Sequence, residues 1–354
     1  MNNQNVNILM LGGKRCGKTT VLASMCNEIN KALAGTGMEI SILDERTRQD
    51  LANARIKIQQ KLEIFKTPLT RIEMDDNPTS AQKTYSFRLT INGKGTGIPF
   101  EMHDIPGEWL TDAHQEQVKA LIHNCQVIII AIDTPYLFSK MTGKGYGAYH
   151  EEYNKPLEIT NFFKNSLSVS DIQDRMILFV PIKCERYYHL TNTPQLNVFN
   201  RNYMRELVNA VSFGYQELIL YLRSTQALAS SCTIAITPIL SAGGIDFVRF
   251  RKDEKTGRMV ALYQEPEFLD PRERGYSPRF CEQPMVYALT YILVQAQLNM
   301  KVKNPLFQVS NNVISGRSQN EVQVALNTLR QKLKRSSGLY AQDGYFIIQN
   351  PRGI

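Results

Sequence analysis

The stretch of sequence that decides the fold is Gly12-Gly13-Lys14-Arg15-Cys16-Gly17-Lys18-Thr19, which directly follows the apolar run Val6–Leu11. The apolar run is too short for a helix and meets glycines at once, which is typical of a buried parallel strand. Residues 19–33 then have the apolar spacing of a helix. The sequence therefore predicts a strand, a glycine-rich loop and a helix in direct succession.

The loop matches the pattern G-x-x-x-x-G-K-[ST] at Gly12, Gly17, Lys18 and Thr19. Its glycines let backbone N–H groups turn inward around a phosphate, and the following helix presents its positive end. Lys18 is expected to reach terminal phosphates and the Thr19 hydroxyl to ligate Mg²⁺. For Arg15, a phosphate contact and a solvent-facing side chain are both open. The expected nucleotide-binding residues are Gly12, Gly13, Lys14, Arg15, Cys16, Gly17, Lys18, Thr19 and Thr20.

Predicted strands and helices alternate along the rest of the chain. This alternation predicts an α/β fold, a mainly parallel sheet covered by helices. An Asn92-Gly93-Lys94-Gly95 turn joins two of the strands in a hairpin. The expected strands are 38–43, 84–91, 98–103, 126–132, 176–182, 233–240 and 344–348, and the expected helices are 46–65, 115–123, 157–167, 203–223, 284–298 and 319–333.

One large domain over residues 1–300 and a C-terminal extension over 301–354 are expected. Residues 38–66 interrupt the alternation as an inserted helical segment. Residues 246–280 form a second insertion, a hairpin and loop. The pattern contains no internal repeat and no long low-complexity tract.

Composition and charge narrow the class of protein. The chain has 354 residues, of which 43% are hydrophobic, and this is ample for a sizeable core. The net charge is +8 and the isoelectric point is near 9.1, but Lys and Arg are scattered. This scattering therefore favours an ordinary solvated surface over a binding site for nucleic acid or anionic lipid. Apart from the basic charge, nothing in the sequence indicates nucleic-acid binding.

Cysteine spacing and hydropathy point to the cytoplasm. The six cysteines lie far apart without a C-x-x-C pair, and the N-terminus is polar rather than a signal peptide. The longest purely apolar run, Val127–Ile132, is far too short to span a bilayer. We expect free thiols in a reducing compartment and no membrane span.

Three further motifs stand where predicted strands end. They are Asp104-Ile105-Pro106-Gly107-Glu108, Ile182-Lys183-Cys184-Glu185 and Leu240-Ser241-Ala242-Gly243-Gly244. Each has an ordinary alternative: a strand-end turn with a helix-capping acid, an exposed lysine and glutamate, and a plain glycine turn. His103 and His114 lack the paired acidic spacing of a metal site. Trp109, the only tryptophan, is open to a packing role or a switch role.

Taken in order, the four motifs resemble the translation-factor-related (Ras-like) P-loop GTPases, most of all the bacterial double-GTPase group. The resemblance implies that Asp104 helps to hold Mg²⁺ and that the Gly107 N–H senses the γ-phosphate. It also implies that Lys183 covers the base and Glu185 accepts hydrogen bonds from guanine. Ser241 and Ala242 would close over the base. The likeness covers residues 6–298, and the tail after Lys301 lies outside it.

The sequence departs from that family at two chemically important positions. Glu108 stands where hydrolysing members usually carry Gln or His to orient water, so Lys18, Gly107 and Glu108 are the expected catalytic residues of a slow enzyme. Glu185 replaces the usual Asp of the guanine-reading motif. A γ-phosphate-sensing threonine is expected before the 84–91 strand. Thr70 is the expected metal ligand, and Thr67, Thr79 and Thr84 are alternatives.

The resemblance implies a switch that binds GTP or GDP with Mg²⁺. Its natural partner would be a second GTPase or an effector, in a homo- or hetero-oligomer, and often in a bacterial defence system. The 246–280 insertion is a candidate partner surface. An ATP-hydrolysing or kinase-type P-loop enzyme is the first alternative, because the loop recognises phosphates and not bases. A catalytically inactive nucleotide-binding scaffold is the second.

Overall fold

The computed structural model describes residues 6–63, 71–73, 81–139, 148–194, 201–266, 275–302, 319–334 and 343–354. The strands are β1 (Val6–Leu11), β2 (Met38–Ile42), β3 (Ile72–Glu73), β4 (Lys83–Ile91), β5 (Lys94–Asp104), β6 (Val127–Asp133), β7 (Arg175–Ile182), β8 (Cys232–Ile236), β9 (Asp246–Lys252), β10 (Met259–Gln264) and β11 (Phe346–Gln349). The helices are α1 (Lys18–Leu33), α2 (Glu45–Glu63), α3 (Gln115–Asn124), α4 (Thr134–Phe138), α5 (Pro156–Ser166), α6 (Glu185–Asn192), α7 (Tyr203–Gly214), α8 (Gln216–Leu222), α9 (Gln226–Ser231), α10 (Gln283–Val302) and α12 (Gln319–Lys332).

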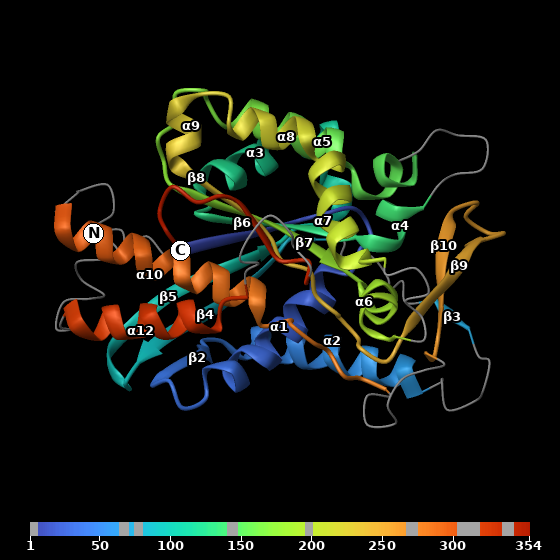
Figure 1. The fold of residues 1–354 in the computed structure, drawn as a ribbon, viewed down its shortest axis with the longest axis horizontal. Coiled ribbons are helices and arrows are strands. Elements are labelled where there is room, and N and C mark those ends of the chain that lie inside the picture. The colour runs from blue at the N-terminus through green and yellow to red at the C-terminus, as the bar shows by residue number, and fades with distance from the viewer. Residues whose placement is uncertain are drawn as a thin grey trace.

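The main sheet has the strand order β11-β8-β7-β6-β1-β5-β4-β2. Its centre, from β8 to β5, is parallel, while β4, β2 and β11 are antiparallel additions at the two edges. The predicted α/β fold with a mainly parallel, helix-covered sheet is confirmed (Figure 1). Strand β1 lies between β5 and β6, so the loop that follows it lies at the middle of the sheet.

Both faces of the sheet are buried because the side chains of each strand alternate between two cores. In β1, Ile8 and Met10 join the core under α1, α10 and α12, whereas Leu9 and Leu11 join the core under α3, α5, α7 and α8. Figure 1 shows these two sets of helices on opposite sides of the sheet. All four side chains are completely buried, and this rigid strand supports the start of the loop.

One predicted helix is wrong. The helix expected over 203–223 is divided into α7 and α8, because α7 ends at Gly214 and Tyr215 is not helical. A Cβ atom on Gly214 would lie 2.6 Å from Nε2 of His150, so only glycine allows the His150 ring to pack there. Nε2 of His150 and the carbonyl oxygen of Gly214 form a hydrogen bond of 3.4 Å. This bond joins the end of α7 to the π-helix His150–Asn154.

The hairpin predicted in the 246–280 insertion is confirmed. Strands β9 and β10 pair antiparallel, and the short strand β3, which the sequence pattern did not indicate, adds to β10. This second sheet projects from one side of the molecule (Figure 1). Its inner residues Ala261 and Tyr263 pack against Ile58 and Leu62 of α2 and against Ala242.

The described residues after 301 pack onto the rest of the molecule. Helix α12 lies along α10, and its Leu326 and Leu329 are completely buried in the same core as β1. Strand β11 pairs antiparallel with β8. The helix and strand predicted in this part of the chain are confirmed. Within the residues that the structure describes, no helix is long and apolar enough to cross a membrane.

Replacing Leu326 with alanine tests whether α12 belongs to the same cooperative unit as the sheet. The change leaves a cavity in the shared core, and it should lower the free energy of unfolding by about 2–5 kcal/mol. Urea denaturation, followed by circular dichroism, measures this. Val324→Ala is the matched control because Val324 is 62% exposed on the same helix, and it should change stability by less than about 0.5 kcal/mol. A separate early transition in the Leu326 variant would instead mean that α12 folds independently.

Candidate functional site

The glycine-rich loop is enclosed so tightly by its neighbours that two of its positions exclude any side chain. A Cβ atom on Gly13 would lie 1.8 Å from the carbonyl oxygen of Tyr153, in the π-helix. A Cβ atom on Gly12, whose φ is +149°, would lie 2.8 Å from the carbonyl oxygen of Ala131 in β6. The loop backbone is therefore fixed between β6 and the π-helix.

The Lys18 side chain lies inside this loop. Its Nζ atom donates to the carbonyl oxygens of Gly12, at 3.0 Å, and Gly13, at 3.3 Å. The side chain is only 6% exposed. A buried ammonium requires oxygen partners, and the two carbonyls supply them.

Thr19 and Asp104 lie side by side, as expected for joint metal ligands. The Thr19 hydroxyl donates to Oδ2 of Asp104 at 2.6 Å. Asp104 is completely buried, and among the described residues its Oδ1 atom accepts no hydrogen bond. Burial raises the pKa of Asp104, while the charge of Lys18 and the Thr19 hydrogen bond oppose that shift. A hydroxyl and a carboxylate are the kind of oxygen donors that Mg²⁺ prefers.

Gly107 and Glu108 lie against the loop in the 3₁₀ helix Gly107–Trp109. A Cβ atom on Gly107 would lie 2.3 Å from the backbone nitrogen of Lys14, so this approach also requires glycine. Oε1 of Glu108 pairs with Nζ of Lys14 at 2.7 Å, and both side chains are partly exposed. Burial raises the pKa of Glu108, but the Lys14 hydrogen bond and charge outweigh burial and hold the pKa below its usual value. Trp109 stacks on His114, with ring centroids 4.7 Å apart.

Lys183 pairs with an acid that the sequence did not single out. Its Nζ atom lies 2.5 Å from Oδ2 of Asp133, the last residue of β6, and both side chains are almost completely buried. The backbone N–H of Asp133 donates to Oδ1 of Asn154 at 2.8 Å. No sequence motif marks Asp133; its position at the end of the strand beside β1 was the available signal.

Glu185 joins the third and fourth motifs. Its Oε1 atom accepts hydrogen bonds from the backbone N–H groups of Ala242, at 2.9 Å, and Gly243, at 3.2 Å. The carboxyl group is 1% exposed, and its Oε2 atom has no hydrogen bond among the described residues. Burial raises the pKa of Glu185 to about 7, although these N–H groups oppose the shift.

One pocket, of about 650 Å³, opens between the four motifs. The predicted residues that line it are Arg15, Cys16, Gly17, Lys18, Thr19, Thr20, Gly107, Glu108, Lys183, Ser241 and Ala242. Gly12, Gly13, Lys14, Asp104 and Glu185 lie directly behind this lining, through the contacts given above. Thr84 bonds to His103 on the sheet instead of lining the pocket. Thr67, Thr70 and Thr79 lie outside the described residues.

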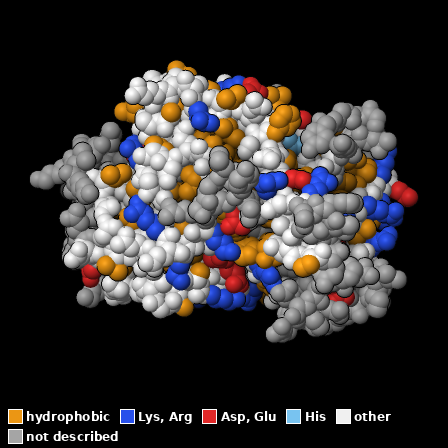
Figure 2. Space-filling model, in the orientation of Figure 1, with side chains coloured by type: hydrophobic (Ala, Val, Ile, Leu, Met, Phe, Trp, Pro, Cys, Tyr) orange, Lys and Arg blue, Asp and Glu red, His pale blue; other side chains and the backbone are white. Residues whose placement is uncertain are grey.

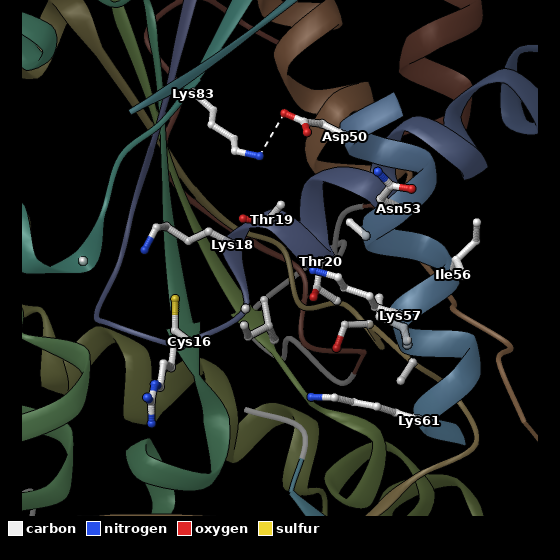
Figure 3. A pocket seen from close by; sticks show the side chains of 18 of the residues that line it. Cys16, Lys18, Thr19, Thr20, Asp50, Asn53, Ile56, Lys57, Lys61 and Lys83 are labelled. Atoms are coloured by element: carbon white, nitrogen blue, oxygen red, sulfur yellow. Dashed lines mark hydrogen bonds and ion pairs between the residues drawn. The ribbon is translucent and has the colours of Figure 1, made fainter. Parts of the chain in front are cut away.

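Helix α2 forms a wall of the pocket that the sequence did not assign to the site. Figure 3 shows Asp50, Asn53, Lys57 and Lys61 of α2 facing the loop residues. Asp50 pairs with Lys83 at 2.9 Å (Figure 3). The available signal was a polar stripe at spacings of three and four residues, beside the row of buried residues Leu51, Ile58 and Leu62. The polar residues of this stripe are Arg46, Asp50, Asn53, Lys57 and Lys61.

Changing Glu185 to glutamine should remove a pH dependence of stability. The carboxyl pKa is 4.5 in its ordinary state and about 7 in the folded protein. The folded state therefore binds more protons between these values, and stability falls as pH rises through this window. Relative to the Gln variant, the wild type should lose on the order of 3 kcal/mol from pH 4.5 to 7. Urea unfolding at several pH values measures this, and Glu116→Gln, at an exposed site, is the control. A difference that does not vary with pH would contradict the prediction.

Residues 7–150 match the family model described as Double-GTPase 2. No significant match was found among curated proteins. Of 29 matching chains in solved structures, one is the "LeoA bacterial dynamin GTPase from ETEC", at 10% sequence identity and a TM-score of 0.31. That match covers 92% of this chain and 39% of the other, so this chain spans about two fifths of the length of that structure.

The family match includes the glycine-rich loop, Asp104, Gly107, Glu108 and Asp133, and it ends before Lys183. The match to the Double-GTPase 2 model over residues 7–150 confirms the resemblance to the double-GTPase group.

Proposed function

We propose that the protein is a guanine-nucleotide-dependent molecular switch, which binds Mg-GTP in the pocket beside Gly12–Thr19 and hydrolyses it slowly to control a protein partner. The observation that carries the proposal is the meeting of four separate motifs around one pocket. They come from the ends of β1, β5 and β7 and from the loop after β8, at the edge of the sheet where α/β proteins bind ligands.

The residues present fit a polyphosphate and Mg²⁺. The glycine loop offers backbone N–H groups, and Lys18 already lies on the carbonyl oxygens of the loop, from which it can turn to a phosphate. Thr19 and Asp104 would hold the metal, and Oδ1 of Asp104 has an unused acceptor. Bound Mg²⁺ would neutralise charge on the terminal phosphates.

Guanine is favoured over adenine by the state of Glu185. Its buried Oε2 lacks a hydrogen-bond donor among the described residues, and guanine N1–H and N2–H₂ are donors that adenine does not present in this arrangement. Adding donors to a buried carboxylate repays part of its desolvation cost. The family match ends before this residue, so the choice of base is argued from the geometry of this chain.

Slow hydrolysis follows from the chemistry of Glu108. Its lowered pKa keeps it ionised at neutral pH, where it can accept a proton or hydrogen bond from water. Its negative charge opposes a nearby phosphate, and Lys14 offsets that charge at 2.7 Å.

The partner that we propose is a second GTPase or an effector, and bacterial defence is the proposed setting. Both rest on the family resemblance.

Nucleotide titration tests the proposal directly. GTP and GDP should bind more tightly than ATP to the wild-type protein, measured by calorimetry with Mg²⁺ present. Lys18→Ala should weaken GTP binding by about 2 kcal/mol or more, since hydrogen bonds to charged groups contribute about 1.5–3 kcal/mol. Glu185→Ala should remove the preference for guanine while retaining binding through the phosphates. Tighter binding of ATP than GTP by the wild type would refute the guanine assignment.

The wall formed by α2 predicts a further effect on affinity. Lys57 lines the pocket, and its exposed ammonium makes no ion pair among the described residues. Lys57→Ala should weaken GTP binding roughly five- to tenfold, because a charge facing the phosphates is lost. Arg48→Ala is the matched control, since Arg48 is exposed on the same helix and pairs with Glu45. Equal effects of the two changes would mean that Lys57 acts only through general charge.

A further inference from the structure

The β9–β10 hairpin reaches the glycine-rich loop through one side chain. Arg258, immediately before β10, donates from Nη2 to the carbonyl oxygen of Lys14 at 3.2 Å. The same guanidinium lies over the ring of Tyr153, with 5.1 Å between its Cζ atom and the ring centroid. Lys14 and Arg258 are 244 residues apart in sequence, so this contact depends entirely on how the insertion docks.

The backbone next to Arg258 is firmly held. The N–H of Met259 donates to the hydroxyl of Tyr153 at 3.1 Å, and the hydroxyl of Tyr136 donates to the Met259 carbonyl at 2.9 Å. Tyr136 also stacks on Phe250 of β9, with centroids 4.9 Å apart. These contacts place the start of β10 at a defined distance from the loop, so Arg258 has little freedom to move away.

Arg258 and Glu108 both contact Lys14 of the loop. Arg258 binds the carbonyl of Lys14, while the ammonium of Lys14 pairs with Glu108. The backbone of Lys14 is also the atom group against which Gly107 packs. The guanidinium of Arg258 lies over the ring of Tyr153. The backbone carbonyl of Tyr153 in turn packs against Gly13, the neighbour of Lys14. A displacement of the hairpin would therefore reach the loop at Lys14 directly and at Gly13 through Tyr153.

We infer that Arg258 is a positioning residue, which couples the inserted hairpin to the Lys14–Glu108 pair and so makes the hairpin a regulatory element of the site. The catalytic part of this inference rests on the proposed function, whereas the positional coupling does not. The outer side of the hairpin carries exposed cations, Arg249, Arg251, Lys252 and Lys255. Figure 2 shows Lys and Arg side chains gathered at the edge of the molecule where β9 and β10 lie. An acidic protein surface that binds these cations would act on Glu108 through Arg258 and Lys14.

Fluorescence of the nucleotide-free protein tests the coupling independently of GTP. Trp109 is the only tryptophan, and it directly follows Glu108. Arg258→Ala should change its emission maximum and raise its quenching by acrylamide about twofold, because Lys14 is no longer held against Gly107 and Glu108. Arg251→Ala is the matched control, since Arg251 is 58% exposed on the same hairpin and pairs with Glu73. If Arg258→Ala behaves as the wild type does, the coupling is refuted.

Single-turnover hydrolysis of Mg-GTP tests the catalytic consequence. Arg258→Ala should slow the hydrolysis step on the order of tenfold with GTP affinity nearly unchanged, because a small misplacement of a catalytic group is costly in rate. Arg258→Lys should restore part of the hydrolysis rate. If the alanine variant folds poorly, the lysine variant replaces it in the comparison with the wild type. In a Lys14→Ala background the Arg258 change should have a smaller further effect, because the Lys14–Glu108 pair is already lost.

The results of these experiments distinguish a failure of the Arg258 coupling from a failure of the proposed function. Additive effects of the Lys14 and Arg258 changes would overturn the inference, since Arg258 would then act by another route. If the wild type neither binds nor hydrolyses GTP, the proposed function fails, and the Trp109 measurement still decides whether Arg258 positions the loop. Loss of GTP affinity equal to the loss of rate in Arg258→Ala would also overturn it, because a positioning residue for Glu108 should change the rate far more than binding.

Discussion

The close approach of carbonyl oxygens to Gly12 and Gly13 is the constraint on which the rest of the site depends. Ala131 in β6 and Tyr153 in the π-helix occupy the space where side chains would stand. The loop therefore has one path between these elements, and that path directs Lys18 inward and starts α1 at a fixed place. Because β6 also ends in Asp133, the same packing brings the partner of Lys183 to the loop.

The site concentrates buried charges that the protein alone satisfies only in part. Lys18 lies on backbone carbonyls and Lys183 on Asp133, so each cation has oxygen partners. Asp104 and Glu185 each retain an oxygen atom without a hydrogen bond among the described residues. A buried, incompletely satisfied carboxylate costs free energy, and a ligand that supplies a cation or N–H donors recovers some of that cost. Part of the electrostatic cost of this fold thus lies where a ligand would relieve it.

The features that were predictable from sequence are those with a local cause. The loop, β1 and α1 follow from glycine placement and from a change of apolar spacing, and the hairpin at 246–280 follows from two short apolar runs around a turn. Asp133 and Arg258 were not predictable because their partners are set by tertiary packing. The role of α2 was missed because its polar stripe is equally compatible with a solvated face. The break between α7 and α8 was missed because the contact of Gly214 with His150 joins residues far apart in sequence.

The position of β1 in the sheet has a consequence for how the chain reaches its native state. Strand β1 is central, and its neighbours β5 and β6 come about 90 to 120 residues later in the sequence. The far edge closes only when β11 pairs with β8, near the end of the described sequence. Non-local pairing of this kind slows folding and leaves strand edges exposed in the interval. During synthesis, β1 and the loop that follows it therefore remain unpaired until β5 and β6 have also left the ribosome.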